Sequence, residues 1–465
     1  MSRINTNVTS LVAQRALSKN NNQLTTSLQR LSTGLKINTG ADDPAGLIAS
    51  QNLEGEKAGI TQAIDNAGRA SNVIGTAEGG LNEVSSLLTQ LQGLVNQAAN
   101  TGGQSTDEIN ANQLQVDSIL STVNRIAQST AFEGKKLLNG NLDYLTSGIN
   151  TTKLANVQVN SARVPDGANI NVVVQVVTSA KTGEVGYTGG TIAGATVTLE
   201  IAGANGTQQL SFASGTAVSA IAAAVTNVKT ATGVSATLSG TALKLDSTEY
   251  GSTKFVSVKT ISGTFLANTK NYGTDASVNI NGAKAQVDGL AASYRSANLD
   301  VQFDLGSTFN LPGTDNFYIK GGGATFALGS KVTETDKASI GVASVSTGSL
   351  GNTNSGYLST LGSGGVNSLS STNLTVAQKV IDAAIGQVSS LRGRLGAFQK
   401  FTIGSTVNSL GVALENATAA QSAIRDTDFA SETAALTRAQ ILSQASTTVL
   451  SQANSAPQQA LRLLQ

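Results

Sequence analysis

The sequence has 465 residues, of which 13% are charged and 4% aromatic, and its formal net charge is +1. At roughly 100–200 residues per domain, this length predicts two to four domains. The absence of Cys and His excludes disulfides, thiolate nucleophiles, imidazole bases and His-based metal sites. We therefore expect no catalytic residue, no metal and no cofactor. The near-neutral charge gives no reason to expect binding to nucleic acid.

The sequence also argues against a membrane protein. No stretch approaches about 18 consecutive apolar residues, so no membrane insertion is expected. Residues 1–10 are polar and lack the apolar core of a secretory signal peptide. Small residues dominate the composition and permit close, repetitive packing. Together with the low charge density, they favour a chain that associates with copies of itself.

Residues 1 to about 140 are predicted to be helical, in two parts separated by a break. The first part has leucines at coiled-coil spacing: Leu17, Leu24, Leu28, Leu31 and Leu35. The break combines residue types that end helices and predict a hinge: Asp42, Asp43, Pro44 and Gly46. These aspartates, like Asp426 and Asp428 further on, could form a metal or acid–base pair. Helix caps are the favoured interpretation.

The second part carries a longer heptad pattern from Ile60 to Ala98. Its apolar positions alternate steps of four and three residues and predict a helical rod about 60 Å long at 1.5 Å per residue. Gly79 and Gly80 are expected to mark close contacts, because glycine costs about 1 kcal/mol in a helix. A turn is expected at 101–103, and a third helix from Ile109 to Ala127.

The middle of the chain, from about residue 142 to 350, is predicted to be mostly strand. Residues 197–201 and 299–305 alternate apolar and polar side chains, as half-buried strands do. Asn281-Gly282 lies between two short alternating stretches and predicts a tight hairpin. Residues 217–229 are expected to form one apolar helix.

From about residue 373 the sequence is helical again and mirrors the N-terminal part. An apolar stripe runs from Ile381 to Ile424, and the break at Asp426 and Asp428 follows it. The last helix has heptad positions at Ala435, Leu442, Val449 and Ala456, with Ala439 and Ala453 between them. We therefore predict that the two terminal helices pair as a coiled coil and that the longer rods bundle.

These patterns give an α+β, multidomain fold class. It combines terminal coiled-coil helices, a long α-helical rod bundle with a β-hairpin region, and a mostly β (α+β) inserted outer domain. The terminal helices could be the core of a monomer, amphipathic membrane-surface helices, or a seam between subunits. Their polar faces carry Gln, Asn, Ser and Thr, which counts against a membrane surface. A seam is favoured, because an Ala-rich pair buries little surface alone and a repeated heterologous contact gives a helical filament.

Several blocks of the sequence resemble bacterial flagellin, the filament subunit. At the N-terminal end these are Ile4-Asn5-Thr6-Asn7, Leu31 to Asn38, and Asp42-Asp43-Pro44-Ala45-Gly46. At the C-terminal end they are Val388 to Arg392 with Leu395-Gly396-Ala397, Ile424 to Ala430, Arg438 to Leu442, and Gln452-Ala453-Asn454. The resemblance covers about residues 1–140 and 375–465. Hook-associated junction proteins share parts of both ends.

The resemblance implies three domains. Residues 1–43 and 421–465 would form the paired terminal coiled-coil domain, and residues 44–165 and 319–420 the rod domain. Residues 166–318 would form a surface-exposed inserted domain.

The resemblance also implies a non-enzymatic subunit that self-assembles into the flagellar filament for swimming motility. A hook–filament junction protein is the alternative, and a filament protein with a hydrolase insertion is a weaker one. The implied partners are copies of itself, an export chaperone on the C-terminal helix, the type III flagellar export apparatus, and filament cap and hook-associated proteins. The implied location is extracellular, without a cleaved signal peptide.

Two sets of residues follow from this resemblance. A seam between subunits is expected to join Leu24, Leu28, Leu31 and Leu35 to Leu442 and Val449. In many flagellins, a stretch of the rod helix contacts a Toll-like receptor through an Arg, a Leu and a Glu. The matching stretch here is Gln90, Leu91, Gln92, Gly93 and Leu94. Gln90 and Gly93 replace the Arg and the Glu, so only weak receptor binding is expected.

Overall fold

The chain forms two compact units in a computed structural model that describes residues 6–100, 102–165, 168–189, 191–192, 194–371 and 374–463. Unit 1 comprises Met1–Gly68, Ala327–Asp336 and Gly404–Gln465, and unit 2 comprises Arg69–Phe326 and Lys337–Ile403. Ile4 and Asn5 of the resemblance, and Thr101 of the expected turn, lie outside the described part of the chain.

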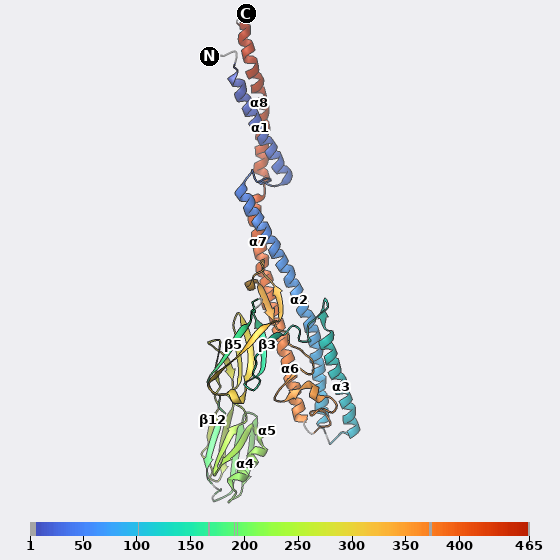
Figure 1. The fold of residues 1–465 in the computed structure, drawn as a ribbon, viewed down its shortest axis with the longest axis vertical. Coiled ribbons are helices and arrows are strands. Elements are labelled where there is room, and N and C mark those ends of the chain that lie inside the picture. Colours follow the sequence, from blue (N-terminus) through green and yellow to red (C-terminus); the bar gives the residue numbers. More distant parts are fainter. Residues whose placement is uncertain are drawn as a thin grey trace. The chain divides into compact units, whose positions relative to one another are not determined.

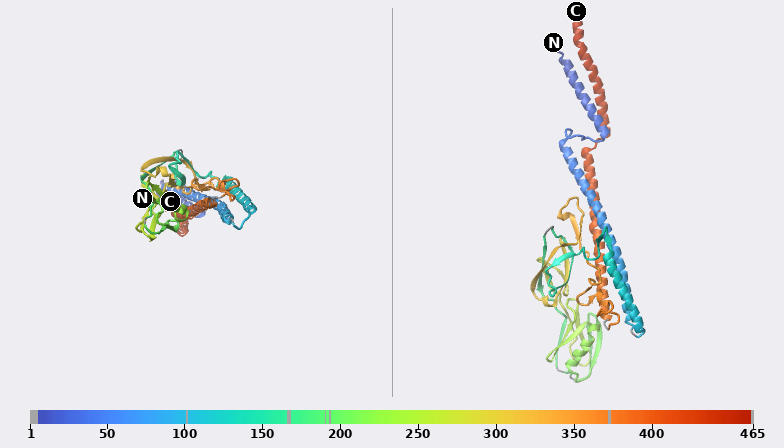
Figure 2. Two further views of the ribbon diagram at one scale, coloured as in Figure 1. Left: turned by 90° about the horizontal axis from the view of Figure 1, so that it is seen from below. Right: turned by 45° about the vertical axis from the view of Figure 1, so that its right-hand side comes forward.

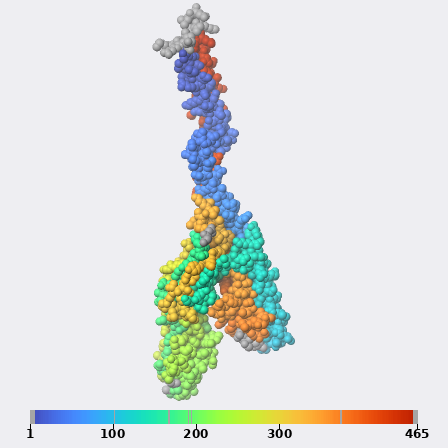
Figure 3. All heavy atoms as spheres, in the orientation of Figure 1, coloured from blue at the N-terminus to red at the C-terminus, as the bar shows by residue number. Residues whose placement is uncertain are grey.

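Unit 1 is built from helices (Figure 1). Helix α1 (Val8–Thr33) lies alongside α8 (Phe429–Leu463), as predicted for the two ends of the chain. Figure 3 shows their surfaces side by side, in blue and red. The N-terminal part of α2 (Pro44–Ala98) and the helix α7 (Gly404–Arg425) also belong to this unit.

The helical part of unit 2 consists of α2 from Arg69 onward, α3 (Thr106–Ser129), α6 (Leu374–Ala397) and the π-helix η4 (Phe398–Ile403). Figure 2 shows α3 returning beside the end of α2. The helix α3 begins with a capping box, in which Ser105 and Glu108 each bond the backbone N–H of the other.

The predicted apolar stripe of α2 is confirmed. Within unit 2, Ile74, Leu81, Leu88 and Leu91 are fully buried. Burying one such side chain contributes about 1.5–3 kcal/mol. The expected close contact at Gly80 is also found, since an added Cβ would lie 2.8 Å from Leu138 Cδ1.

The same expectation is wrong for the neighbouring Gly79. Nothing lies within 4 Å of a Cβ added there, because this position faces away from the packed side.

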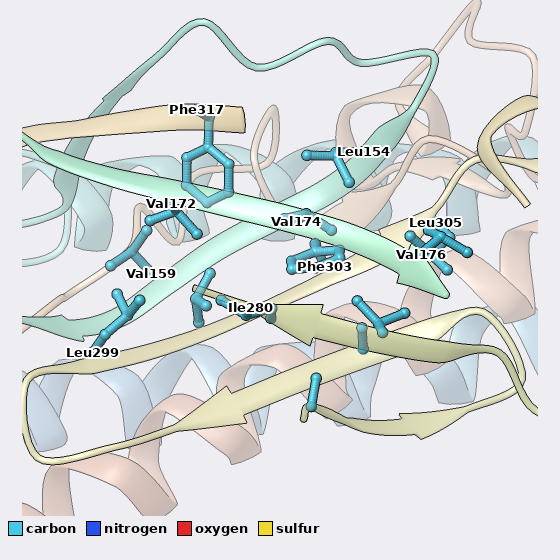
Figure 4. Packing of buried hydrophobic residues seen from close by; sticks show 14 of the residues in the cluster. Leu154, Val159, Val172, Val174, Val176, Ile280, Leu299, Phe303, Leu305 and Phe317 are labelled. Carbon is cyan, nitrogen blue, oxygen red and sulfur yellow. The ribbon is translucent and has the colours of Figure 1, made fainter. Parts of the chain in front are cut away.

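The first β lobe of unit 2, here called lobe A, has two sheets with strand orders β14-β13-β5-β18-β3 and β15-β16-β17-β4. One shared core joins them (Figure 4). The strands are β3 (Tyr144–Ser147), β4 (Leu154–Ala162), β5 (Ile170–Thr178), β13 (Ser277–Ile280), β14 (Ala283–Lys284), β15 (Gln286–Asp288), β16 (Ala291–Arg295), β17 (Leu299–Leu305) and β18 (Gly313–Gly322). As predicted, the alternate residues of β17 are buried, from Leu299 to Leu305.

The second β lobe, lobe B, is inserted in the chain between β5 and β13. Its sheets have the orders β12-β11-β7-β8 and β6-β10-β9. The elements are β6 (Glu184–Thr188), β7 (Val197–Gly203), β8 (Gly206–Phe212), α4 (Val218–Asn227), α5 (Lys229–Thr232), β9 (Val234–Ser239), β10 (Ala242–Ser247), β11 (Phe255–Ser262) and β12 (Thr269–Tyr272). Helix α4 matches the predicted apolar helix, and Ile221 and Val225 are buried in the lobe's own core.

Short elements complete the described chain. They are β1 (Ala131–Phe132), β2 (Lys135–Lys136), η1 (Ser307–Phe309), β19 (Ala324–Ala327), η2 (Glu334–Asp336), β20 (Lys337–Ile340), β21 (Gly351–Asn352), β22 (Gly356–Tyr357) and η3 (Leu358–Leu361).

The predicted hairpin is found between β13 and β14. Asn281 and Gly282 have φ values of 49° and 82°, the left-handed geometry that an Asn-Gly turn accommodates. The side-chain oxygen of Asn281 also accepts a 2.8 Å hydrogen bond from the backbone N–H of Val173.

Lobe A extends beyond the expected limits of the inserted domain, 166–318. Strand β4 precedes residue 166, yet it pairs with β17 along its length. Strand β18 crosses residue 318 and pairs with both β3 and β5. The packed lobe therefore runs from Tyr144 to Gly322, because strands on both sides of the expected limits bury their side chains in one core.

Candidate interaction surface at the paired terminal helices

Helices α1 and α8 face each other with a narrow stripe of mostly small residues. The least exposed positions step by four and three residues along both helices. They are Ala13, Leu17, Asn20, Leu24, Ser27 and Leu31 on α1, and Leu436, Ala439, Ser443, Ser446, Leu450 and Ala453 on α8. This stripe is the intrachain seam, and seven of its twelve positions are Ala, Ser or Asn, against five leucines.

Hydrogen bonds cross the intrachain seam at several levels. The Asn20 side-chain amide donates to Ser446 Oγ at 2.7 Å and to the Leu442 backbone carbonyl at 3.2 Å. Ser443 Oγ donates to Asn21 Oδ1 at 2.8 Å. Each such bond contributes about 0.5–1.5 kcal/mol net, so the pairing is held partly by polar contacts.

Only some of the heptad positions predicted for α8 face α1. Ala439 and Ala453 lie in the intrachain seam, whereas Leu442 and Val449 are 41% and 57% exposed, because the seam uses their smaller neighbours Ser443 and Ser446 instead. Leu442 and Val449 therefore lie outside the intrachain seam. Their pairing with another copy stays a prediction.

The expected α1 residues divide into two groups. Leu24 and Leu31 are half-buried in the intrachain seam, whereas Leu28 is 50% exposed. Leu35 lies just beyond α1 and forms an isolated backbone bridge with Asp426. The paired helices thus leave a row of apolar side chains uncovered: Val8, Leu11, Val12, Leu28, Ile441, Leu442 and Val449. Exposed apolar side chains gathered on one pair of helices are candidates for an interaction site.

The predicted hinge after α1 is held by hydrogen bonds to the side chains of Asp42 and Asp43. Asp42 Oδ2 accepts bonds from the Thr39 N–H at 2.7 Å, the Thr39 hydroxyl at 3.0 Å and the Asn38 N–H at 3.1 Å, and these donors lower the pKa of its carboxyl below 3.8. Asp43 caps α2 by accepting from the Gly46 N–H at 2.9 Å. Pro44 is the first residue of α2, where no N–H is needed.

Gly46 is required by space in this first turn. A Cβ there would lie 2.6 Å from both Asp43 Oδ2 and Ile37 Cδ1. Asp43 can therefore cap the helix only if residue 46 carries no side chain.

The second break, before α8, is capped in the same way. Asp428 Oδ1 accepts bonds from the backbone N–H groups of Ala430 and Ser431 at 2.9 and 3.2 Å. Asp426 accepts a 2.6 Å bond from the Ser422 hydroxyl. The favoured capping interpretation holds for Asp43 and Asp428, which accept bonds from first-turn N–H groups of α2 and α8. Asp42 instead bonds the preceding turn, and Asp426 bonds a side chain of α7. In the described part of the chain, no group of three or more acidic side chains is arranged to hold a metal.

The two breaks are bonded to each other. The Lys36 N–H donates to the Arg425 carbonyl at 2.7 Å, and the Thr427 N–H donates to the Gly34 carbonyl at 2.9 Å. These two backbone hydrogen bonds hold the two breaks together, so the hinge is not free to bend.

The rod stretch singled out from the sequence lies in unit 2. Leu91 is fully buried, Gln90 and Gly93 are exposed, and Leu94 is half-buried. The Gln92 amide donates to Asp382 Oδ1 at 3.1 Å. Gln90 and Gly93 therefore lie where a partner could reach them.

Paired ends, long rods and inserted β lobes define a structural, rod-forming class of protein. The family described as the bacterial flagellin N-terminal helical region matches residues 4–143, and the bacterial flagellin C-terminal helical region matches residues 378–464. Flagellin D of Vibrio anguillarum is 30% identical and flagellin D of Vibrio cholerae 32%, each with 99% of both chains covered. The chain therefore belongs to the bacterial flagellins, the subunits of the flagellar filament.

Solved structures give weaker likenesses. FliC from Burkholderia pseudomallei is 17% identical, with 71% of this chain and 99% of that chain covered and a TM-score of 0.24. The flagellar junction protein FlgL from Legionella pneumophila is 12% identical, with 81% and 99% covered and a TM-score of 0.29. These scores carry no argument. The full-length likeness to flagellins favours the filament subunit over the junction protein.

Within the described ranges, no helix combines the length and the apolar character needed to cross a lipid bilayer.

Proposed function

We propose that this flagellin polymerises by covering the exposed apolar row of α1 and α8 with the same helices of neighbouring copies. The carrying observation is that Leu28, Leu442 and Val449 remain exposed after the two helices have paired. Water-exposed apolar area of this kind contributes about 25 cal/mol per Å² when it is covered. A contact that repeats without closing generates a filament.

The test is Leu442→Asp, with Gln444→Asp as a matched control. Both positions are exposed on α8, so neither aspartate disturbs the folded chain. Leu442→Asp places an unpaired charge in the subunit contact, at a cost of several kcal/mol. We expect soluble monomer from Leu442→Asp and long filaments from the control by electron microscopy. Normal filaments from Leu442→Asp would contradict the proposal.

The same electron microscopy also distinguishes a filament subunit from a hook–filament junction protein. A filament subunit grows long polymers from purified chain alone, whereas a junction protein does not. As a filament subunit, the chain would meet filament cap and hook-associated proteins at the ends of the polymer.

Delivery to the filament is also part of the proposal. The chain would pass unfolded through the type III flagellar export apparatus to the outside of the cell, without a cleaved signal peptide. An export chaperone would cover the apolar face of α8 from Ala435 onward. The polar intrachain seam supports easy unpairing of the ends. Protease should trim both ends of the monomer first and spare them in the filament, and equal protection in both would contradict the idea.

Weak binding to a Toll-like receptor is proposed for the exposed positions around Gln90 and Gly93. Each missing charged side chain removes a contact of about 1.5–3 kcal/mol. The double variant Gln90→Arg with Gly93→Glu should raise the signal of a receptor reporter cell at least tenfold. An unchanged signal would contradict the proposed receptor contact.

A further inference from the structure

A groove of about 730 Å³ runs between α1 and α8, on unit 1. Four cations line it: Arg15, Lys19, Arg30 and Arg438. They are all of the basic side chains that the structure describes on these two helices, and they come from both. The sequence alone shows four scattered cations, and the pairing of the helices brings them into one place. We call this surface the basic groove.

The basic groove has little negative charge of its own. Its one acidic residue, Glu432, pairs with Arg30 at 3.5 Å. Among the described residues, Arg15, Lys19 and Arg438 have no carboxylate within ion-pair distance. The buried Nε of Arg30 has no hydrogen-bond partner either. The basic groove therefore has positive charge and hydrogen-bond donors that are not matched by described groups of the same chain.

The neighbouring sequence cannot supply the missing charge. There is no Asp or Glu before Asp42, and none after Glu432. Glu432 is therefore the one acidic residue of the two helices, and it already pairs with Arg30. A partner with acidic side chains would complement the remaining cations.

Exposed acidic residues of unit 1 lie instead outside the groove, among them Glu415 on α7, and three of them share the first part of α2. Glu54, Glu56 and Asp65 are exposed there. Glu54 pairs with Arg425 at 3.5 Å, an exposed contact of small net worth. Glu54 and Asp65 are eleven residues apart, which is close to three helical turns, so they share one face of α2.

The basic groove repeats with the same spacing. Lys19 and Arg30 are also eleven residues apart on α1, about 16 Å along the axis at 1.5 Å per residue. An acidic stripe and a basic stripe of equal spacing can therefore match in register. Within the described chain, no ion pair joins the two stripes.

We infer that the basic groove of one copy binds the acidic face of α2, with Glu54 and Asp65, on a second copy. The inference rests on the proposed polymerisation, and it adds a second, electrostatic contact to the apolar row. The contact is head-to-tail, because the groove and the acidic face lie on different parts of the chain. Such a contact sets the direction and the register in which copies add.

A charge-swap experiment tests this contact. One variant is Lys19→Glu with Arg438→Glu, a second is Glu54→Lys with Asp65→Lys, and a third carries all four changes. Lys135→Glu with Lys136→Glu is the matched control, since both lysines are exposed on β2 of unit 2. The critical concentration for polymerisation is measured by sedimentation, and the fold of each monomer by circular dichroism.

Each double variant should raise the critical concentration about tenfold or more, because attraction becomes repulsion. The fourfold variant should return it most of the way, and the control should leave it unchanged. Recovery in the fourfold variant cannot come from misfolding.

Two results would overturn the inference: wild-type polymerisation of the groove variant, or a fourfold variant as defective as the doubles. The inference would also be overturned if the groove variant polymerised poorly while the α2 variant polymerised normally. The basic groove would then bind something other than the acidic face of α2. Failure of the proposed function is recognised separately, as absence of filaments from the wild-type chain.

Discussion

Helices of similar length bury very different amounts of side chain in the two units. In α6, with 24 residues, seven side chains are buried, from Ala377 to Leu395. In α1, with 26 residues, only Ala13 and Ser27 are buried. The rod helices of unit 2 are thus stabilised within one chain. The terminal helices leave much of their apolar surface exposed, and we therefore predict that their order depends on assembly.

The largest expected effect comes from truncating a core side chain of the rod. Leu91→Ala should lower the free energy of unfolding of the monomer by about 2–5 kcal/mol, since Leu91 is fully buried. Leu24→Ala on α1 should lower it by less than about 1 kcal/mol, because Leu24 is half-buried in a weakly held pair. Guanidinium unfolding of both monomers gives the two values. Similar losses would show that the ends are already part of the folded core.

An intermediate effect is expected from removing β lobes. Lys181 and Thr274 exchange two backbone bonds of 2.9 Å where the chain enters and leaves lobe B. Replacing 182–273 by a short Gly-Ser linker should therefore leave lobe A folded and polymerisation intact. Removing 166–318 instead takes away β5 and β17, and strips β4 of its partner.

The melting temperatures and the filaments of the two deletion variants test this difference. We expect wild-type filaments from the 182–273 deletion and a destabilised, aggregating chain from the 166–318 deletion. If the shorter deletion abolished assembly while the rods stayed folded, lobe B would hold essential lattice contacts.

The smallest effect concerns Asp42 at the capped break. Its folded pKa is lowered by the Thr39 and Asn38 donors, so its stabilising contribution is present above the unfolded pKa and is lost as the pH falls through the folded one. The stabilising contribution of Asp42 to the break should therefore be complete at pH values above about 4 and should decrease only below that pH. Titration by NMR should give Asp42 a pKa below that of an ordinary Asp side chain, and Thr39→Val should raise it. An unshifted or raised pKa in the unaltered chain would contradict the geometry.

The sequence predicts the rod well, because burial along α2 follows a strict local period from Ile60 to Ala98. On α8 the sequence predicts only part of the seam. Ala439 and Ala453 belong to the heptad pattern and lie in the seam, but Ser443 and Ser446 are polar and give no apolar signal, whereas the apolar Leu442 and Val449 are exposed. The caps at Asp43 and Asp428 follow from residue type alone, since an aspartate before a helix has few other uses.

Other features need information that no local pattern contains. The extent of lobe A depends on which strands pair, and β4 and β17 are far apart in the chain. The basic groove depends on how α1 and α8 are rotated against each other, since Lys19 and Arg438 converge only after pairing.

The polar intrachain seam has a consequence for handling of the chain. The two helices of a leucine-filled coiled coil would, once separated, expose apolar surfaces that bind other unfolded chains. Because seven of its twelve positions are Ser, Ala or Asn, the intrachain seam exposes less apolar surface on separation than a seam of leucines would. We therefore expect the two ends to separate and pair again with less aggregation than a leucine-filled coiled coil would show.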